Sequence, residues 1–505
     1  MKKPSSKKWG MIMGDKTILA IDQGTTSSRA ILFSSKGDIL SLKQKELKLY
    51  YPNNGWVEQN AKDIWDDTLE VCRDLMSEIG DNANNIASVG ITNQRETTIL
   101  WDKHTGEPVY NAIVWQDRRT GDMCEKLKQA GHELSITTKT GLLLDPYFSA
   151  TKIKWILDNV DGVRARAEQG DILFGTVETY LLWKLTNGTS HYSDITNASR
   201  TMLFNIREQK WDHDLLELFH IPPSILPDVK DNAFDFGKIS PEHFGRGLKV
   251  QGMAGDQQAA TIGQACFETG MVKSTYGTGC FALMNIGKDF KKSQNRLLTT
   301  IAYRLNGEIK YAIEGSIFVA GAAIQFLRDN LGLFSDASQT QAMAESIEDT
   351  NGVYFVPALT GLGAPYWNAE ARGMISGLTR GTNKEHIVRA ALEAQAYQTY
   401  DLLGAMEDDT GTELQTLRVD GGLVTNQFVC QFLADILNVR IEVPKVTETT
   451  AWGAACLAGL QSGVFNSLDD ISGNWAANDI YEPSIDAQKK TALIEGWKSS
   501  ISKLI

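Results

Sequence analysis

The sequence predicts an α/β fold with two similar lobes. Strand-like segments alternate with helix-like segments along the chain, which is typical of layered α/β proteins with a mixed sheet. Turns that combine glycine and threonine between two strands occur near residue 25 and again near residue 278, about half of the chain apart. At 505 residues the chain is also too long for one ordinary domain of roughly 100–200 residues.

The first half begins with a strand, a turn and a second strand. The turn, residues 24–28, is rich in glycine and hydroxyl side chains, and the segments on either side are apolar and β-branched. A helix is expected from Ala61, with Asn60 as its N-cap, because apolar residues then recur three or four positions apart. Strands are expected at 17–21, 29–33, 86–92 and 112–115.

The second half repeats this order of elements. The turn at residues 276–279 lies between two apolar strands, as the first turn does. Strands are also expected at 250–253, 417–419 and 440–443, and helices at 259–266 and around 429–437. The repetition predicts a second lobe that resembles the first.

Composition and charge exclude several classes of function. Fifty Lys and Arg residues against 62 Asp and Glu residues give a net charge of −12. Such a chain is a poor candidate for non-specific binding to nucleic acid or to an anionic membrane surface. An anionic substrate would therefore need local cations, backbone amides or a metal ion.

The cysteines and the apolar segments indicate a cytoplasmic protein. The six cysteines form no C-x-x-C pair, and so few in so long a chain are not a disulfide framework. No apolar run approaches the roughly 18 residues of a membrane span, and the basic N-terminus lacks the apolar core of a secretion signal. Residues 1–15 are expected to form a loose tail.

The segment Asp22–Arg29 is the strongest local motif. An acid at the end of a strand is followed by a turn of small residues with four hydroxyls and then by an arginine. Turn amides and hydroxyls can hold phosphate oxygens, and Asp22 could hold a hydrated Mg²⁺ ion. A solvated hairpin turn is the alternative, because such turns also favour Gly, Thr and Ser.

Two further polar blocks follow predicted strands. In residues 255–258 (GDQQ), Asp256 could accept a proton from a substrate hydroxyl, although an N-cap aspartate is the alternative. In residues 93–98 (NQRETT), Arg95 and Glu96 supply donors and an acceptor suited to vicinal hydroxyls, whereas a surface ion pair is the alternative.

Two weaker features complete the pattern. Asp420-Gly421-Gly422 precedes a helix, where a nucleotide could lie close to the backbone, or where the glycines could simply flank a helix end. Trp115 lies beside polar residues and could form an apolar wall of a small-ligand site, although core packing is its usual role.

Several of these blocks resemble the glycerol kinases, within the FGGY family of carbohydrate kinases. The resemblance runs from about residue 17 to about residue 460. It is carried by residues 22–29, 90–98 (GITNQRETT), 110–116 (YNAIVWQ), 145–148, 197–205 (NASRTMLFN), 255–259 (GDQQA), 276–281 (YGTGCF) and 419–422 (VDGG). Residues 147–159 and 373–393 resemble two longer signatures of the wider FGGY family.

The resemblance implies two actin-like or hexokinase-like lobes of ribonuclease-H type around a central cleft. Residues 16–262 would form an N-terminal lobe with the first phosphate loop and the glycerol site, and residues 263–505 a C-terminal lobe that binds nucleotide. The implied reaction is ATP-dependent phosphorylation of glycerol to sn-glycerol 3-phosphate with Mg²⁺. Glycerol and ATP or ADP would be the binding partners, without nucleic acid or a membrane span.

The resemblance also implies roles for individual residues. Asp256 resembles the general base, and Asp22 resembles the carboxylate that organises Mg²⁺ through water. The residues that resemble those at the substrate are Thr25, Arg95, Glu96, Trp115, Tyr147, Asp256, Gln257 and Phe281. The residues that resemble those at the nucleotide are Thr25, Thr26, Ser27, Arg29, Thr278, Gly279, Gly321, Gln325, Gly422 and Asn426.

Other functions are compatible with parts of this pattern. An FGGY kinase for another polyol or a ketose would share the fold, although Arg95, Glu96 and Tyr147 together favour glycerol. A regulatory or chaperone-type ATPase with actin-like lobes would need further domains, and an inactive relative would not need both Asp22 and Asp256. A homodimer or homotetramer is expected only because closed symmetric assemblies are common.

Overall fold

A computed structural model gives the fold of residues 16–368 and 370–505. The described chain divides into two units. The first holds residues 16–265, 299–311 and 448–474, and the second holds residues 266–298, 312–447 and 475–505. Two α/β lobes were predicted as consecutive halves, but two later segments belong to the first unit. The expected tail, residues 1–15, lies outside the described residues.

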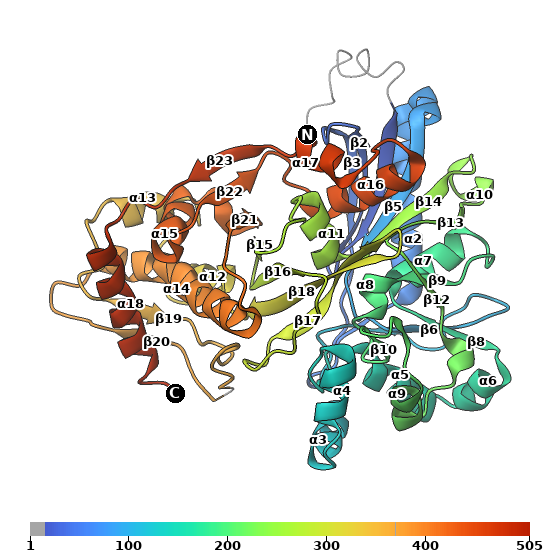
Figure 1. The fold of residues 1–505 in the computed structure, drawn as a ribbon, viewed down its shortest axis with the longest axis horizontal. Coiled ribbons are helices and arrows are strands. Elements are labelled where there is room, and N and C mark those ends of the chain that lie inside the picture. Colours follow the sequence, from blue (N-terminus) through green and yellow to red (C-terminus); the bar gives the residue numbers. More distant parts are fainter. Residues whose placement is uncertain (1–15, 369) are drawn as a thin grey trace. The chain divides into compact units, whose positions relative to one another are not determined.

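The first unit is built on a six-stranded mixed sheet with the order β13-β14-β5-β1-β2-β3 (Figure 1). Strands β1, β2 and β3 are antiparallel, whereas β5 runs parallel to β1 and to β14. The strands are β1 Thr17–Gln23, β2 Ser27–Ser34, β3 Ile39–Glu46, β5 Ile86–Asn93, β13 Ala233–Lys238 and β14 Lys249–Gly255.

The parallel pairing determines where the polar motifs lie. Gln23 at the end of β1 is opposite Asn93 at the end of β5, and Asn93 is in turn opposite Gly255 at the end of β14. The carboxyl ends of the three strands therefore meet at one edge of the sheet. This is the usual position of a ligand site in a parallel α/β sheet.

Helices cover both faces of this sheet because its buried strands are apolar on both sides. Leu19 and Ile21 pack in one core with helix α2 (Ala61–Ile79), whose N-cap Asn60 accepts a hydrogen bond from the Lys62 amide as predicted. The alternate residue Ile18 faces helix α16 (Thr449–Ser462), which packs along β5 and β14 (Figure 1). A helix from the last part of the chain thus completes the first unit.

The remaining elements of the first unit are shorter. The helices are α3 Gly121–Gln129, α4 Glu133–Thr140, α5 Ser149–Asn159, α6 Val163–Gln169, α7 Val177–Leu185, α8 Ile195–Ala198, α9 His213–Phe219, α10 Pro241–Phe244, α11 Asp256–Gly263 and α17 Leu468–Asn474. Short strands are β4 Glu58–Gln59, β6 Ile99–Asp102, β7 Ala112–Ile113, β8 Ile172–Gly175, β9 Tyr192–Asp194, β10 Phe204–Asn205, β11 Lys210–Trp211 and β12 Asp228–Lys230.

Two predicted elements differ from the structure. The strand expected at 112–115 is only β7, which pairs with β4 outside the main sheet. The helix expected at 259–266 is α11, which begins three residues earlier and ends at Gly263, because Ala265 takes a left-handed backbone conformation with φ of 49°. Helix α11 therefore starts directly at Asp256.

Helices α11 and α16 approach each other so closely that glycine is required. A β-carbon built on Gly453 would lie 1.7 Å from the carbonyl oxygen of Ala259. Because backbone atoms rather than flexible side chains occupy this space, neither helix can yield locally.

We expect Gly453→Ala to lower the free energy of unfolding by about 3 kcal/mol, since overpacking a rigid core forces backbone shifts. Gly404→Ala is the matched control, because Gly404 lies inside helix α14 and a β-carbon built on it would meet no neighbouring group within 4 Å. Alanine there should stabilise the helix by about 0.5–1 kcal/mol. Urea denaturation of both variants measures the difference, and equal midpoints would contradict the close approach.

The second unit is built on strands of a seven-stranded sheet with the order β17-β18-β16-β15-β21-β22-β23, of which β17, apart from its first residue, and the start of β18 lie in the segment 299–311 of the first unit. Strands β15 and β16 form an antiparallel hairpin, and β21 runs parallel to β15, which repeats the pairing of β1, β2 and β5. The strands are β15 Met271–Tyr276, β16 Cys280–Gly287, β17 Leu298–Leu305, β18 Glu308–Ile317, β21 Thr416–Asp420, β22 Ile441–Pro444 and β23 Ala477–Tyr481; a separate pair is β19 Tyr354–Val356 with β20 Met374–Ser376. The predicted repetition of one lobe architecture is confirmed.

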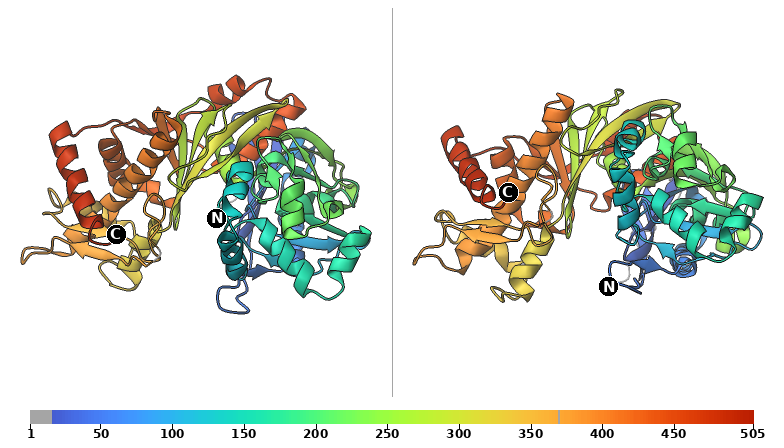
Figure 2. Two further views of the ribbon diagram at one scale, coloured as in Figure 1. Left: turned by 60° about the horizontal axis from the view of Figure 1, so that its bottom comes forward. Right: turned by 90° about the horizontal axis from the view of Figure 1, so that it is seen from below.

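The helices of the second unit pack through aromatic residues. They are α12 Gly321–Asp329, α13 Gln339–Glu345, α14 Lys384–Thr410, α15 Gln427–Leu437 and α18 Ala487–Ile501. Tyr397 of α14 stacks on Trp497 of α18 at 5.3 Å and meets Phe432 of α15 edge-on at 5.5 Å, so the three helices lie side by side (Figures 1 and 2). None of the helices in the described ranges combines the length and apolarity needed to cross a membrane.

Candidate active site

The first predicted phosphate turn lies between β1 and β2. The Gly24 amide donates to the Ser27 carbonyl at 2.9 Å, which closes the turn. Thr26 at its tip is exposed, and Ser27 is already the first residue of β2. The Thr25 hydroxyl accepts a hydrogen bond from Trp115 Nε1 at 2.9 Å, and its carbonyl accepts one from Gln59. Side chains from other segments therefore fix the turn, and some of its polar groups remain exposed.

Arg29 points back at two carboxylates rather than outward. Its guanidinium forms ion pairs with Asp22, directly opposite on β1, and with Glu448 at the start of α16. Burial raises the pKa of Asp22, although the Arg29 charge opposes this shift. Two acids thus share one cation beside the turn.

Arg95 and Asp256 lie together at the ends of β5 and β14. Arg95 Nε is 3.2 Å from Asp256 Oδ1, and Arg95 Nη1 donates to Gln258 Oε1 at 3.1 Å. The Arg95 side chain is buried, whereas about a third of the Asp256 side chain is exposed. Asp256 is the first residue of α11 and Gly255 is the N-cap, so the alternative of an N-cap aspartate is wrong.

Glu96 is buried next to this pair. Its backbone takes a left-handed conformation with φ of 60°, and its carbonyl accepts hydrogen bonds from the Ser149 and Thr98 hydroxyls. Its carboxylate lies 3.9 Å from Arg95 Nε and 2.6 Å from Arg200 Nε. The alternative of a surface ion pair for Arg95 and Glu96 is therefore wrong, because both side chains are only 2% exposed.

Aromatic rings lie beside these polar groups. Trp115 and Tyr147 meet edge-on with ring centroids 5.7 Å apart, and both are partly exposed. Burial lowers the pKa of Lys152 to about 8, and its ammonium group donates to the carbonyls of Tyr147 and Phe148.

Gln257, next to Asp256, is also partly exposed. Phe281 belongs to the second unit, where it lies opposite Thr275 at the start of β16.

A network of buried polar side chains supports the ends of these strands. Asp194 accepts hydrogen bonds from Thr196, Asn197 and Asn232, and the Thr196 hydroxyl accepts one from the Gly255 amide at 3.0 Å. Asn93 bridges Asn197 to Glu178. Burial, together with the Asp194 charge, raises the pKa of Glu178, and burial also raises the pKa of Asp194. The network fixes Gly255, the residue before Asp256.

The second predicted phosphate turn, Gly277–Gly279, lies between β15 and β16. The start of α12 closes onto it: the amides of Ala320 and Gly321 donate to the carbonyls of Thr278 and Gly277, each at 2.9 Å. A β-carbon on Gly321 would lie 2.6 Å from the Gly277 carbonyl oxygen, so this approach requires glycine. Thr278 is exposed.

The other predicted nucleotide residues lie near this turn or cap a helix. Gly422 follows Gly421, and a β-carbon on Gly421 would lie 2.4 Å from the Tyr276 carbonyl oxygen at the end of β15. Gln325 is exposed one turn into α12. Asn426 is nine-tenths buried and is the N-cap of α15, where its side chain also donates to the Thr340 hydroxyl. The structure thus brings the glycines together, whereas Asn426 has a capping role.

Sequence reasoning missed several residues of the site. Arg200 lies within the quoted segment 197–205, but no role was predicted for it. Glu448 and Thr196 were missed as well, because each becomes relevant only through a partner elsewhere in the chain. The sequence carried no signal for Arg200, because its neighbours Ser199 and Thr201 are polar and do not indicate that it is buried.

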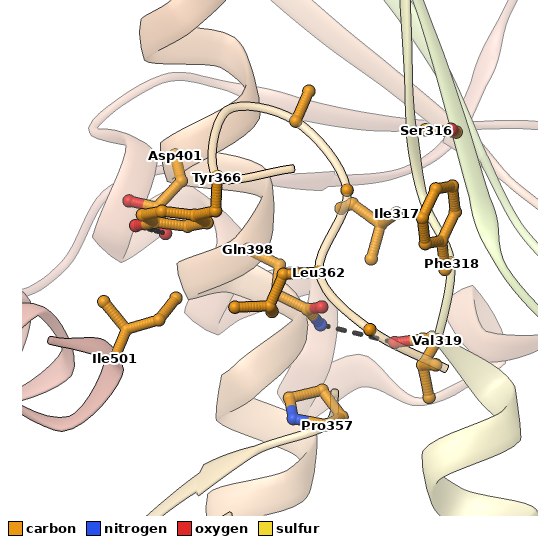
Figure 3. Close-up of a pocket in the computed structure, with 13 residues that line it drawn as sticks. Ser316, Ile317, Phe318, Val319, Pro357, Leu362, Tyr366, Gln398, Asp401 and Ile501 are labelled. Carbon is orange, nitrogen blue, oxygen red and sulfur yellow. Dashed lines mark hydrogen bonds between the residues drawn. The ribbon is translucent and has the colours of Figure 1, made fainter. Parts of the chain in front are cut away.

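The second unit also contains a small pocket that none of the predicted site residues line (Figure 3). Its wall includes Phe318, Leu362, Tyr366, Gln398 and Asp401. The Asp401 carboxylate accepts hydrogen bonds from Trp497 Nε1 at 2.6 Å and from the Tyr366 hydroxyl at 2.8 Å. Burial raises the pKa of Asp401 to about 6.

This shift predicts a pH-dependent gain in stability for Asp401→Asn. The unfolded carboxyl loses its proton near pH 4 and the folded one near pH 6, so the parent loses stability as pH rises through this window. The amide cannot ionise but still accepts both hydrogen bonds. We expect the variant to gain about 1–3 kcal/mol over the parent at pH 8 and about half as much at pH 5. Urea denaturation at both pH values measures this, with exposed Asp329→Asn as the control without a gain.

The two units share one architecture, which defines a class of protein. Each has a hairpin whose turn carries glycine and threonine and whose first strand pairs in parallel with a later strand. This is the architecture of actin-like, ribonuclease-H-type α/β proteins, and the first unit adds a cluster of buried charges at its strand ends.

Comparison with known proteins identifies the family. Residues 17–263 match the N-terminal domain of the FGGY family of carbohydrate kinases, and residues 272–462 match its C-terminal domain. The chain therefore belongs to the FGGY family of carbohydrate kinases.

Several known proteins are similar to this chain over nearly its whole length. A glycerol kinase of Nitrosomonas eutropha is 62% identical over 97% of this chain and 98% of its own length, and one of Rhodospirillum rubrum is 56% identical over 96% and 98%. The crystal structure of Plasmodium falciparum glycerol kinase with ADP has a TM-score of 0.93 at 36% identity, covering 97% of this chain and 98% of that chain. Gluconate kinase from Lactobacillus acidophilus, with a TM-score of 0.85 at 24% identity and coverage of 95% and 96%, shares the fold.

Proposed function

We propose that this chain transfers the γ-phosphoryl group of ATP to a terminal hydroxyl of glycerol, giving sn-glycerol 3-phosphate and ADP. The observation that carries the proposal is the pairing of partly exposed Asp256 with buried Arg95, beside Glu96, at the ends of β5 and β14. The names of the relatives that match the whole chain support glycerol as the substrate.

Glycerol is small and carries three hydroxyl groups, so fixed polar groups must recognise it. The Arg95 guanidinium supplies donors and the Glu96 carboxylate supplies acceptors, which suits two neighbouring hydroxyls. The partly exposed rings of Trp115 and Tyr147 suit its carbon chain. A site of this kind rejects analogues that lack a hydroxyl, because its buried polar groups would then be left unpaired.

Asp256 is the general base of the proposed reaction. Its carboxylate takes the proton of the terminal hydroxyl while that oxygen bonds to the γ-phosphorus. The bond between the γ-phosphorus and the β–γ bridging oxygen breaks at the same centre, and ADP leaves with that electron pair. Such a transfer needs alignment and charge neutralisation more than covalent help from the protein.

The turn residues Thr25, Thr26 and Ser27 are proposed to receive phosphate oxygens through amides and hydroxyls, as are Thr278 and Gly279. Bound Mg²⁺ neutralises phosphate charge. Asp22 suits a hydrated Mg²⁺, because a hard carboxylate oxygen is its preferred protein ligand. Among residues 16–368 and 370–505 no three Asp, Glu, His or Cys side chains are grouped for a metal, so water and phosphate are proposed to complete the shell.

We further propose that the first unit carries the glycerol site and that the second carries the adenosine site around Gly321, Gln325, Gly422 and Asn426. A cytoplasmic location and a homodimeric or homotetrameric state are also part of the proposal. All six cysteines are buried thiols, which supports a reducing compartment. Light scattering would test the oligomeric state.

A coupled assay of ADP release with MgATP tests the function. Glycerol, xylulose, ribulose, gluconate and dihydroxyacetone are compared as acceptors, with a reaction lacking any acceptor as the control. Turnover that depends on glycerol and is much weaker with the others is the expected result. Selective turnover of a sugar would move the substrate to another polyol or a ketose, and turnover without any acceptor would favour a regulatory ATPase.

A further inference from the structure

A fully buried arginine, Arg200, lies behind the residues proposed to bind glycerol. It follows helix α8 in the described chain, and its Nε donates to Glu96 Oε1 at 2.6 Å. Its guanidinium carbon lies 5.6 Å from the Tyr147 ring centre and 5.4 Å from that of Phe148. Arg200 thus touches two residues of the proposed glycerol site without reaching solvent itself.

The two buried arginines serve different acids. Arg95 Nε is 3.2 Å from Asp256 but 3.9 Å from Glu96, whereas Arg200 Nε is 2.6 Å from Glu96. Of these two ion pairs of Glu96, the one with Arg200 is therefore the closer. Because a buried carboxylate without a cation resists ionisation, the guanidinium of Arg200 maintains the acceptor character of Glu96.

The backbone at Glu96 is held by its conformation and by two hydrogen bonds. Glu96 has a left-handed φ of 60°, and its carbonyl is held by the hydroxyls of Ser149 and Thr98. With the backbone held in this way, the side chain is directed by the bond from Arg200.

We propose that Arg200 is a positioning and specificity-determining residue that holds the Glu96 carboxylate ionised and in place for the substrate hydroxyls. The inference rests on the proposed function, because it names what maintains the acceptor of that same site. Arg200 does not touch substrate, and it acts through Glu96.

Arg200→Met tests this role with steady-state kinetics, since methionine keeps much of the apolar volume and removes the charge. We expect kcat/KM for glycerol to fall roughly 10- to 100-fold, mainly through KM, while KM for ATP changes less than about threefold. Arg200→Lys should restore part of the loss. Equal changes in both KM values would overturn the proposal.

A double-mutant cycle decides whether Arg200 acts through Glu96. If it does, Glu96→Gln/Arg200→Met should lose no more activity than Glu96→Gln alone, because the neutral amide no longer needs a cation. Losses that multiply would overturn the proposal. The double variant leaves no unpaired buried charge at this position, so it also serves if Arg200→Met fails to fold.

The pH profile supplies a readout that a merely structural role would not move. The charged groups near Glu96 include Arg95, Arg200 and Lys152, and Arg95 also pairs with Asp256. In Arg200→Met, kcat/KM for glycerol should increase as the pH rises, because Glu96 must then lose its proton without its cationic partner. The double variant has no carboxyl group at this position, so it should not show this increase. Identical profiles for the two variants would overturn the proposal.

A matched control comes from the second unit. Arg389 Nε pairs with Glu393 Oε1 at 2.9 Å, and its guanidinium lies 5.0 Å from the Phe428 ring centre. Arg389→Met removes a similar ion pair, so it should lower stability without changing KM for glycerol.

The parent enzyme separates the two hypotheses. No glycerol turnover by the parent would reject the proposed function, whereas normal turnover by the parent with additive losses in the variants would reject only the role of Arg200.

Discussion

Asp256→Asn should lower kcat for glycerol phosphorylation by about 10³- to 10⁴-fold. A positioned general base contributes up to this factor, and an amide cannot take the proton of the attacking hydroxyl. The side chain keeps its size and still accepts a hydrogen bond from Arg95 at the position of Oδ1, so the site should remain assembled. Glycerol and ATP should therefore still bind, which equilibrium titration calorimetry measures beside the coupled assay.

The control for this variant is Asp235→Asn. Asp235 is an exposed acid on β13 that pairs with Lys249 at 2.6 Å, and it should change neither binding nor turnover. A loss of activity in Asp256→Asn that comes from weaker binding alone would assign Asp256 to recognition. A rate near that of the parent would remove it from the role of base.

Local chemistry explains why some elements could be predicted. The β1–turn–β2 hairpin follows from β-branched apolar residues around a glycine turn, and Asn60 caps α2 as predicted. Each depends on residues within a few positions of one another. The repetition of the Gly–Thr turn at two points was also visible, and the structure confirms two lobes of the same design.

Long-range pairing explains what could not be predicted. The resemblance implies a place for Arg29 at the nucleotide, but its ion pair with Glu448, more than four hundred residues away, could not be predicted from the sequence. Helix α16 completes the first unit by packing closely on α11 and β5. The residues near α16 in the sequence do not indicate this contact. The first unit therefore also includes residues 299–311 and 448–474, which lie beyond the expected boundary at residue 262.

Burial is the reason that Arg95 and Glu96 do not form the surface ion pair considered as an alternative. Adjacent opposite charges on a turn usually form a solvated pair of little energetic consequence. Here β5 lies between β1 and β14, so the residues that follow it are covered by both neighbouring strand ends. Only the sheet order reveals this position, and a single sequence does not give that order.

Arg95→Ala should lower kcat/KM for glycerol by about 10²- to 10³-fold, or about 3–4 kcal/mol of transition-state stabilisation. The substitution removes the donors proposed for the substrate hydroxyls and also leaves Asp256 and Gln258 without their shared partner. Both effects act on the glycerol side of the reaction. KM for glycerol should therefore rise far more than KM for ATP, which initial rates over a grid of both substrates measure.

Arg95→Lys separates charge from geometry. Lysine keeps the positive charge near Asp256 but cannot donate to Asp256 and Gln258 from one planar group, so it should recover only part of the loss. Full recovery would show that charge alone matters at this position. Equal increases in both KM values for Arg95→Ala would instead place Arg95 outside the substrate side, because a residue that holds glycerol has no reason to weaken ATP to the same extent.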